Sequence, residues 1–374
     1  MVVAGNEVLM LRPIKAVLLG DAMIPVPGFE AAWRKHLAEF GDDLVLGDWE
    51  SDWGKLQYRR LEVEKQGPEI ETVPELILEA GGDAELLAGL FVPVSSKVMD
   101  AMPKLRIVGV CRAGVENVNV DAATERGIAV FHIMGRNAHA VSDFAIGMML
   151  AEARNIGRAH HAIKTGAWRK TFANSDIVPE LGGRTIGLVG FGYIGKLVAK
   201  KLAGWDVRIL AYDPFAAPET LAAAGVEAVD LDTLLSQSDI VSLHARLTDD
   251  NVGMIGREQL AKLKPTAILV NTSRAGLIDT DALVQTLREG RIAGAALDVF
   301  PTEPIPEGSP ILDLDNVTLT THIAGTTADA LTNSPYLLMA DIARFAAGER
   351  PQFLYNPAVL EDPGFQAWAA GLRG

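Results

Sequence analysis

The stretch GLVGFGYIG, residues 187–195, joins a short apolar strand to a helix expected over residues 194–202. Its glycines Gly190, Gly192 and Gly195 have the spacing GxGxxG. In such a loop the first glycine permits a tight turn and the second allows a pyrophosphate to approach the backbone. The third lets the helix pack closely against the strand. The stretch therefore predicts a dinucleotide-binding turn.

Two further features make this prediction specific. Tyr193 and Ile194 stand at the start of the expected helix, where the positive end of the helix dipole favours phosphates. Asp213 ends a strand expected over residues 207–212, and it stands where a carboxylate can accept hydrogen bonds from the ribose hydroxyls of NAD and repel the extra phosphate of NADP. A GxGxxG alone more often marks a tight turn, but between strand and helix, with an acid about 20 residues on, it predicts NAD binding.

The composition limits the class of protein. With 374 residues the chain exceeds one typical domain, so two are expected. The formal net charge of −14 argues against nucleic acid and anionic membranes as partners, which both require basic surface. No stretch approaches the ~20 apolar residues of a membrane span, and a cytoplasmic protein is expected. Cys111 is the single cysteine, so we expect a buried thiol, no disulfide and no metal site built on cysteines.

Short apolar runs alternate with helical patterns along the chain, which predicts parallel sheets with right-handed crossovers. The expected strands are 16–19, 86–91, 106–111, 128–133, 185–189, 207–212, 240–245, 267–271, 293–299 and 317–321. The expected helices are 29–40, 74–80, 96–102, 140–165, 194–202, 220–224, 257–263, 280–289 and 328–347. Residues 47–67 are charged and aromatic without a clear period, and they are left unassigned. Two α/β units result, and the glycine-rich turn belongs to the second.

Three polar residues follow strands of the second unit: Arg274, Glu303 and His322. Taken singly, an arginine there more often caps a surface turn, and the acid and the histidine are more often structural than catalytic. Together they match what reduction of a 2-keto acid needs. Arg274 can hold a carboxylate by two charge-assisted bonds, and His322 can protonate the forming alkoxide. Glu303 would orient the imidazole and stabilise its charged form.

The motifs SRAGLID, LDVFPTEP and TTHIAG, together with GFGYIG, resemble those of the D-isomer-specific 2-hydroxyacid dehydrogenases. The likeness runs from about residue 86 to the end of the last helix. It implies two Rossmann-like or flavodoxin-like parallel-sheet domains with a cleft between them. It further implies that residues 1–135 and 326–374 form a discontinuous substrate domain, and that residues 136–325 form the NAD-binding domain. The helix over residues 138–150 resembles one that packs across a two-fold axis, which implies a homodimer.

The resemblance also assigns individual residues. It makes Arg274, Glu303 and His322 the catalytic three and Asp298 the acid near the nicotinamide carboxamide. Further candidate contacts for the cofactor lie after strands of the second unit, at His244, Arg246, Thr272 and Gly325. The loop at Arg112, Ala113 and Gly114 resembles one that clasps the substrate carboxylate through backbone N–H groups. Arg112 and Arg154 resemble positions that hold a phosphate, although an exposed arginine in a long helix is the ordinary expectation for Arg154.

Three residues depart from the family's pattern. Ala275 stands in place of a glycine, and Thr321 in place of the proline before the histidine. Arg246 replaces a proline near the expected adenosine half of the cofactor, where it could stack on adenine or soften the preference for NAD. A solvent-facing arginine is an equally good interpretation of Arg246.

The prediction is therefore an NAD-dependent oxidoreductase for a D-2-hydroxy acid or 2-keto acid, with a phosphorylated three-carbon acid as one candidate substrate. A glyoxylate or hydroxypyruvate reductase is an alternative within the same class. A different class is an NAD(H)-sensing protein similar to the transcriptional corepressors that resemble this family. Formate dehydrogenases have a glutamine at the position of Glu303, so that residue argues against them. Turnover separates the enzyme from the sensor.

Overall fold

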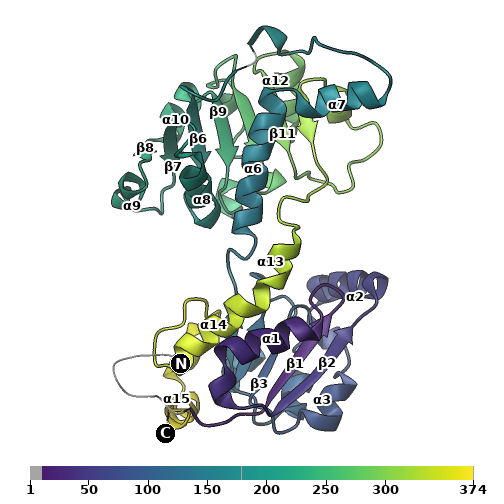
Figure 1. The fold of residues 1–374 in the computed structure, drawn as a ribbon, viewed down its shortest axis with the longest axis vertical. Coiled ribbons are helices and arrows are strands. Elements are labelled where there is room, and N and C mark those ends of the chain that lie inside the picture. Colours follow the sequence, from purple (N-terminus) through teal and green to yellow (C-terminus); the bar gives the residue numbers. More distant parts are fainter. Residues whose placement is uncertain (1–10, 178, 374) are drawn as a thin grey trace. The chain divides into compact units, whose positions relative to one another are not determined.

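The computed structural model describes residues 11–177 and 179–373. The chain forms two compact units. One consists of Met1–Arg136 with Thr327–Gly374, and the other of Asn137–Thr326. Each unit has its own parallel sheet with helices on both faces (Figure 1). The predicted fold class, two parallel-sheet α/β units, is confirmed.

The first unit contains a five-stranded parallel sheet in the order β2-β1-β3-β4-β5, the arrangement known from flavodoxin-like folds. Its strands are β1 (Ala16–Asp21), β2 (Leu44–Glu50), β3 (Leu86–Gly89), β4 (Ile107–Val110) and β5 (Ala129–His132). Its helices are α1 (Val26–His36), α2 (Trp53–Gln66), α3 (Glu75–Ala80), α4 (Ser96–Ala101), α5 (Val120–Glu125), α13 (Ala328–Thr332), α14 (Ser334–Ala346) and α15 (Pro363–Gly371). The carboxyl-terminal helices thus return to the unit that the amino-terminal strands begin.

The core of this unit follows from the two-residue period of its strands. In β1, Ala16 and Leu18 face one apolar layer, while Val17 and Leu19 face the other. All four are fully buried or nearly so, because helices cover both faces of the sheet. Helix α14 packs against α1 on one of these faces (Figure 1).

The unassigned segment, residues 47–67, contains the end of β2 and helix α2. Asp52 caps this helix by accepting a hydrogen bond from the backbone N–H of Lys55. Helix α2 buries only Leu56 and Val63, so its apolar stripe is narrow. A stripe of two residues gives little periodic signal, which explains why the sequence did not reveal the helix.

The second unit contains a seven-stranded parallel sheet in the order β12-β11-β10-β9-β6-β7-β8. Its strands are β6 (Thr185–Val189), β7 (Arg208–Tyr212), β8 (Glu227–Ala228), β9 (Ile240–Leu243), β10 (Ile268–Asn271), β11 (Gly294–Leu297) and β12 (Val317–Leu319). Its helices are α6 (Ala138–Ala153), α7 (Ile156–Lys164), α8 (Tyr193–Leu202), α9 (Pro218–Ala223), α10 (Leu231–Gln237), α11 (Arg257–Leu260) and α12 (Thr280–Arg288). From β6 the chain adds β7 and β8 on one side of the sheet and then β9 to β12 on the other, so the strand order reverses between β6 and β9. Ligands of doubly wound sheets bind beyond the carboxyl ends of the strands at such a switch point.

The long helix expected over residues 140–165 is two helices, so that prediction was wrong. Helix α6 ends at Ala153, and Asn155 adopts a left-handed conformation with φ 57° before α7 begins. The Asn155 amide is buried and donates to Asn174 Oδ1 over 2.7 Å, which stabilises the break. Helix α6 packs on β10 and β11 and beside α8 (Figure 1).

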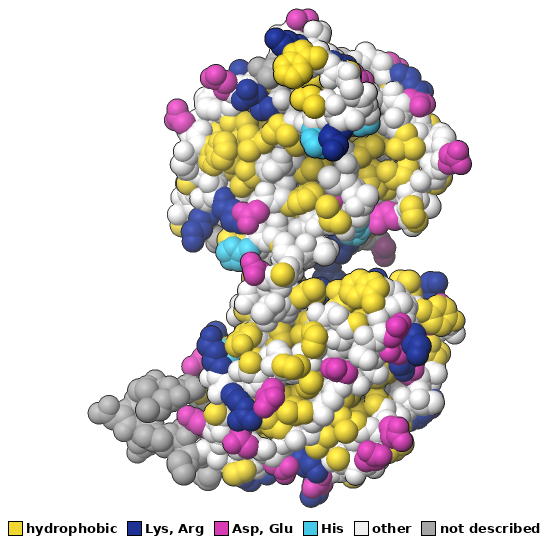
Figure 2. Space-filling model, turned by 45° about the vertical axis from the view of Figure 1, so that its right-hand side comes forward, with side chains coloured by type: hydrophobic (Ala, Val, Ile, Leu, Met, Phe, Trp, Pro, Cys, Tyr) yellow, Lys and Arg dark blue, Asp and Glu magenta, His cyan; other side chains and the backbone are white. Residues whose placement is uncertain are grey.

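On the face that Figure 2 shows, charged side chains of both signs are mixed. Figure 2 shows Lys and Arg side chains interspersed with Asp and Glu on the visible face, without segregation by sign. Within the described residues, no helix is long and apolar enough to cross a membrane.

Candidate active site

The glycine-rich turn lies between β6 and α8, as the sequence predicts, and two of its glycines are required by contact. Gly190 has φ 97°, and a Cβ there would lie 2.6 Å from the backbone nitrogen of Ala245. A Cβ on Gly195 would collide with the Gly190 carbonyl oxygen. Gly192, by contrast, precedes the helix with open space around its α-carbon. Its backbone is thus accessible to a pyrophosphate, beside the helix N-terminus at Tyr193.

Asp213 follows β7 at the same edge of the sheet. Its Oδ2 accepts a hydrogen bond from the backbone N–H of Phe191 over 2.6 Å, and its Oδ1 accepts from that of Phe215 over 2.8 Å. The carboxylate is therefore fixed against the glycine-rich turn. Each oxygen keeps acceptor capacity for a second donor, such as a ribose hydroxyl.

Two polar side chains near the switch point lack protein partners. His244 follows β9, and neither ring nitrogen has a hydrogen-bond partner within the described residues; the same holds for Thr272 Oγ1. Burial alone lowers the pKa of His244 to about 4, so its imidazole is neutral at pH 7. Buried polar atoms without partners are uncommon in proteins and mark places where a ligand completes the bonding. These atoms, the open backbone at Gly192 and the anchored Asp213 together fit a dinucleotide.

The three candidate catalytic residues follow β10, β11 and β12 in turn. His322 Nδ1 lies 2.8 Å from Glu303 Oε2, and Glu303 Oε1 accepts from the Phe300 N–H over 2.9 Å. Burial acts to raise the pKa of Glu303. It is outweighed by the hydrogen bonds from His322 and Phe300 and by the charge of Arg274, so the pKa lies below its ordinary value. The structure thus brings Glu303 and His322 into contact, with Arg274 close enough to act on the carboxylate.

The turn that carries Arg274 is fixed by its neighbours. Asn271 ends β10, and its Oδ1 accepts from the Ser273 N–H over 3.0 Å while its Nδ2 donates to the Arg274 carbonyl over 2.9 Å. The Ser273 hydroxyl donates to the Ala245 carbonyl over 2.9 Å. The Arg274 side chain itself is exposed, and within the described residues its guanidinium donates a single hydrogen bond, to the adjacent Ser273 carbonyl over 2.8 Å. Its guanidinium thus retains most of its donors for an anion.

Asp298 supports the loop that presents His322. Its carboxylate is fully buried and accepts from Thr320 Oγ1 over 2.6 Å and from the backbone N–H groups of Ile323 and Ala324 over 3.0 and 2.9 Å. These bonds lie on both sides of His322, whose φ of 56° is a left-handed conformation that is uncommon among residues other than glycine. Asp298 therefore positions His322 through the backbone. The sequence predicts only a place near the nicotinamide carboxamide for Asp298, and this positioning role is additional.

The loop after β4 holds the candidate substrate residues of the first unit. Arg112 is paired on both sides, with Glu64 Oε1 at 2.8 Å and Glu116 Oε2 at 2.6 Å, and it also lies over the ring of Phe91. The Ala113 carbonyl accepts from His132 Nδ1 over 2.8 Å. Gly114 allows the Glu116 carboxylate to approach, because a Cβ there would collide with it. Cys111 is a buried free thiol whose pKa burial raises well above its ordinary value.

The structure does not bring Arg154 to the edge that holds His322. Helix α6 is ~24 Å long at 1.5 Å per residue, and Arg154 follows its far end. Nearby, Arg158 Nε donates to the Asp315 carbonyl, which precedes β12. Arg154 thus lies near the amino ends of the strands, with its side chain exposed.

Arg246 is also exposed, in agreement with the solvent-facing interpretation, although it follows β9 at the carboxyl edge.

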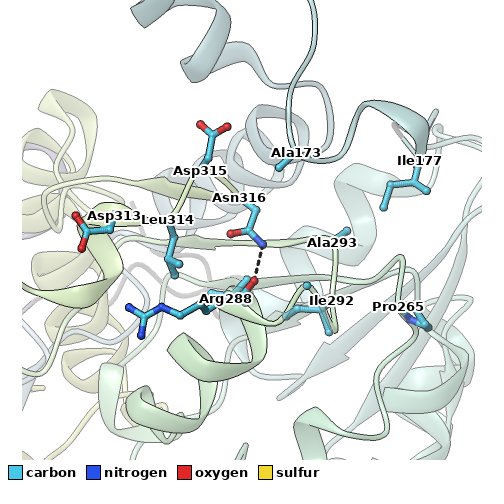
Figure 3. Close-up of a pocket in the computed structure, with 12 residues that line it drawn as sticks. Ala173, Ile177, Pro265, Arg288, Ile292, Ala293, Asp313, Leu314, Asp315 and Asn316 are labelled. Atoms are coloured by element: carbon cyan, nitrogen blue, oxygen red, sulfur yellow. Dashed lines mark hydrogen bonds between the residues drawn. The ribbon is translucent and has the colours of Figure 1, made fainter.

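A pocket at the amino ends of β10, β11 and β12 is separate from this site. Figure 3 shows Pro265, Ile292 and Asn316 around it, each just before one of these strands, and Arg288 from the end of α12. The Asn316 amide donates to the Leu287 carbonyl over 3.2 Å. None of the candidate catalytic or cofactor residues lines this pocket.

Sequence reasoning missed two residues that shape the site. Thr320 bonds to Asp298, and the side chain of Asn137 lies against Gly325, where a Cβ would collide with the amide. Asn137 stands directly before α6, and Thr320 directly after β12. An asparagine at a helix start and a threonine after a strand are common structural features, so neither carries a signal that could have revealed it. Among the described residues, no group of three His, Cys, Asp or Glu side chains could hold a metal ion.

A doubly wound sheet with a dinucleotide turn, and a His–Glu pair at the same edge, define an NAD-dependent oxidoreductase. Residues 146–324 match the family model described as the NAD binding domain of D-isomer specific 2-hydroxyacid dehydrogenases. The chain is 42% identical over 290 residues to a glyoxylate reductase of Thermofilum pendens, covering 77% of this chain and 85% of that one. The chain belongs to the D-isomer-specific 2-hydroxyacid dehydrogenase family.

Two further comparisons agree with this assignment. The chain is 37% identical over 308 residues to a D-3-phosphoglycerate dehydrogenase of Archaeoglobus fulgidus, covering 81% of this chain and 58% of that one. The solved NAD-complexed D-isomer specific 2-hydroxyacid dehydrogenase of Lactobacillus delbrueckii ssp. bulgaricus has the same fold, with a TM-score of 0.72 at 23% identity over 91% of this chain and all of that one. The predictions of the family, of NAD as cofactor and of hydride transfer to or from 2-hydroxy acids are confirmed.

Proposed function

We propose that Arg274, Glu303 and His322 carry out the reduction of a 2-keto acid to a D-2-hydroxy acid, and the reverse oxidation. The observation that carries this proposal is the 2.8 Å contact between His322 Nδ1 and Glu303 Oε2, with the charge of Arg274 acting on the same carboxylate. A cation, a proton donor and an oriented carboxylate at one strand edge are the groups that this reaction requires. NADH, when bound, supplies the hydride.

The contact with Glu303 determines which nitrogen of His322 is available. Because Nδ1 lies against the carboxylate, Nδ1 carries the hydrogen and donates it, and Nε2 remains to protonate the substrate oxygen. Glu303 thereby fixes the orientation of the imidazole ring during the proton transfer. Arg274 holds the substrate carboxylate by two parallel bonds, which fixes the carbonyl beside Nε2.

The residues proposed to contact the cofactor lie at the same carboxyl edge of the seven-stranded sheet. The backbone at Gly192 and Tyr193 receives the pyrophosphate, and Asp213 accepts hydrogen bonds from the ribose. The negative charge of Asp213 disfavours the additional phosphate of NADP. His244 and Thr272 supply polar atoms that have no partner within the described residues. The second unit is thus proposed as the NAD-binding domain.

The first unit is proposed as the substrate domain, with the backbone around Ala113 and Gly114 receiving a carboxylate. We further propose a homodimer formed through α6, whose exposed residues include His139, Asp143 and Gly147. A Cβ on Gly147 would meet nothing within 4 Å, so this face is open to a close neighbour. A cytoplasmic location remains part of the proposal.

Two substitutions test the assigned roles. His322→Asn should lower kcat about 10²- to 10⁴-fold, the usual contribution of a general acid, while the Kd of NADH changes less than about 3-fold.

Arg274→Met should lower kcat/KM at least about 100-fold, since each lost charge-assisted bond is worth about 1.5–3 kcal/mol. His160→Asn on the exposed part of α7 is the control. Equal loss of turnover and NADH binding in His322→Asn contradicts its role as proton donor.

The same assay separates the enzyme from an NAD(H) sensor. A sensor binds NADH without oxidising it in the presence of any 2-keto acid. NADH oxidation by the wild-type protein that disappears in His322→Asn supports the enzyme.

A further inference from the structure

The cavity at the amino edge of the seven-stranded sheet is formed entirely by residues of Asn137–Thr326. Its volume is about 410 Å³, within the range of about 300–1,000 Å³ that is usual for small-molecule sites. Ala293 and Asn316 line it directly before β11 and β12 begin, and Pro265 lines it three residues before β10. Strands β10 and β11 have four residues each, so they carry the chain ~13 Å from this cavity to the edge that holds His322. A ligand in the cavity would therefore not overlap the cofactor or the substrate.

The cavity has an apolar floor and an anchored wall. Ile292, at its floor, is a buried residue of the core of this unit. Ala173 and Ile177 line it from the segment between α7 and β6 (Figure 3). Between them, the buried Asn174 accepts a hydrogen bond from Asn155 Nδ2 over 2.7 Å. The wall is thus held in place by the protein itself, without a ligand.

Two opposite charges line the cavity without a partner. Arg288 ends α12, and Asp313 lies in the turn that precedes β12. Among the residues that the structure describes, none forms a hydrogen bond or an ion pair with the side chain of Arg288 or Asp313. The third charged residue of the lining, Asp315, is already paired with Arg169. One cation and one anion are therefore available to a ligand.

The arrangement of charged and apolar residues restricts the chemistry of this ligand. Figure 3 shows Arg288 and Asp313 on one side of the cavity, and Pro265 and Ile177 on the other. A simple carboxylate would be attracted by Arg288 but repelled by Asp313, and a simple amine would meet the reverse. A molecule that carries both charges at one end and an apolar group at the other complements the whole lining, including the apolar floor at Ile292.

We propose that this cavity binds an α-amino acid with an apolar side chain. The carboxylate accepts hydrogen bonds from the Arg288 guanidinium, the ammonium group donates to the Asp313 carboxylate, and the side chain packs on Ile292. The proposal concerns residues of one unit and does not rest on the roles proposed for the catalytic residues.

Calorimetry on the full chain tests the charge requirement. The probe is leucine, with two analogues that each lack one charge: 4-methylpentanoate lacks the ammonium group, and 3-methylbutan-1-amine lacks the carboxylate. We expect leucine to bind with a Kd of about 10⁻⁵–10⁻³ M, as suits a ligand of this size. Each analogue should bind at least about 10-fold more weakly, because one charge-assisted bond is lost and one protein charge is left facing the ligand.

Substitutions at the two charges test the assignment of each group. Arg288→Gln and Asp313→Asn should each weaken leucine binding at least about 10-fold, with the Tm unchanged because both side chains are exposed. Asp313→Asn should bind 4-methylpentanoate at least as tightly as wild type does, since it removes a like charge. The matched control is Arg257→Gln, which alters an exposed arginine of α11 in the same unit and should change leucine binding less than about 2-fold.

Two further titrations distinguish this cavity from the catalytic edge. Leucine binding should persist in the presence of saturating NADH and in Arg274→Met. Loss of leucine binding under either condition would place leucine at the carboxyl edge and overturn the proposal. Failure of leucine, valine and phenylalanine to bind at about 10 mM would overturn it as well. None of these measurements requires turnover, so a failure to reduce 2-keto acids bears only on the proposed function.

Discussion

His322 is held in a left-handed backbone conformation, which is uncommon for residues other than glycine. A left-handed φ on a residue other than glycine costs about 1–3 kcal/mol. Asp298 supplies the compensation, because its buried carboxylate bonds to the residues on both sides of the histidine. Glu303 then fixes the ring through Nδ1. The imidazole is thus oriented by one acid acting on its backbone and another acting on its side chain.

His244 should make the stability of the protein dependent on pH. Its pKa is about 4 in the folded state and about 6.5 when unfolded, because burial disfavours the charged ring. Below pH 6.5 His244 binds a proton in the unfolded chain but stays neutral in the folded one. The contribution of His244 to the free energy of unfolding therefore falls as the pH falls, and it becomes constant below about pH 4. The loss from pH 7.5 to 5 is about 2 kcal/mol. Thermal unfolding of the NAD-free protein across this range measures it.

The variant His244→Gln isolates this contribution from the other titrating groups. Its Tm should fall less than that of wild type between pH 7.5 and 5, whatever its absolute stability. His160→Gln, on an exposed helix position, should keep the wild-type pH dependence. Parallel Tm curves for His244→Gln and wild type would show that the His244 ring is protonated as readily in the folded protein as in water.

At the residue scale, the catalytic candidates could be predicted and their contacts could not. Arg274, Glu303 and His322 each follow an apolar run, and parallel strands bring their carboxyl ends to one edge. The pairing of Arg112 with Glu64 has no such signal, because the two are 48 residues apart and Glu64 lies in a helix that the sequence does not reveal.

The turn between β6 and α8 offers a matched pair of glycine substitutions. In Gly190→Ala, a Cβ would lie 2.6 Å from the Ala245 nitrogen and require φ 97°, so we expect a loss of at least about 2 kcal/mol in the free energy of unfolding. In Gly192→Ala, the Cβ meets nothing within 4 Å, so stability should change by less than about 1 kcal/mol. The Kd of NADH should nevertheless rise about 10-fold or more, because the methyl group occupies the approach to the helix N-terminus.

Chemical denaturation and NADH titration distinguish these two effects. Unchanged NADH affinity in a stable Gly192→Ala protein would exclude this turn as the pyrophosphate site. A Gly190→Ala protein as stable as wild type would show that the turn adapts to a side chain, contrary to the contact in the structure.

At the scale of elements, the strands were easier to predict than the helices. Buried parallel strands are continuous apolar runs, and each expected run contains a strand. The helix limits depended on particular residues. The break between α6 and α7 rests on Asn155, whose amide bonds to Asn174, nineteen residues away. Helix α2 buries two side chains only, so its period is hidden by charged residues.

The whole molecule combines two parallel sheets of different strand order, each with its own apolar layers on both faces. The sheet of Asn137–Thr326 carries the dinucleotide turn and the His–Glu pair at its carboxyl edge. The sheet of the other unit carries Arg112, Ala113 and Gly114 after strand β4, at its own carboxyl edge. Because each unit has a complete core, the polar residues at the two edges are not needed to fill it.

The family and the site assign to this chain a hydride transfer between NAD(H) and a 2-hydroxy acid. The most direct test is the absorbance of NADH at 340 nm with a panel of glyoxylate, pyruvate, hydroxypyruvate, oxaloacetate and 3-phosphohydroxypyruvate, repeated with NADPH, and with chiral analysis of each product. We predict oxidation of NADH in preference to NADPH, and products of the D configuration wherever a stereocentre forms. Binding of NADH without oxidation by any acid of the panel, or formation of L products, would contradict the account.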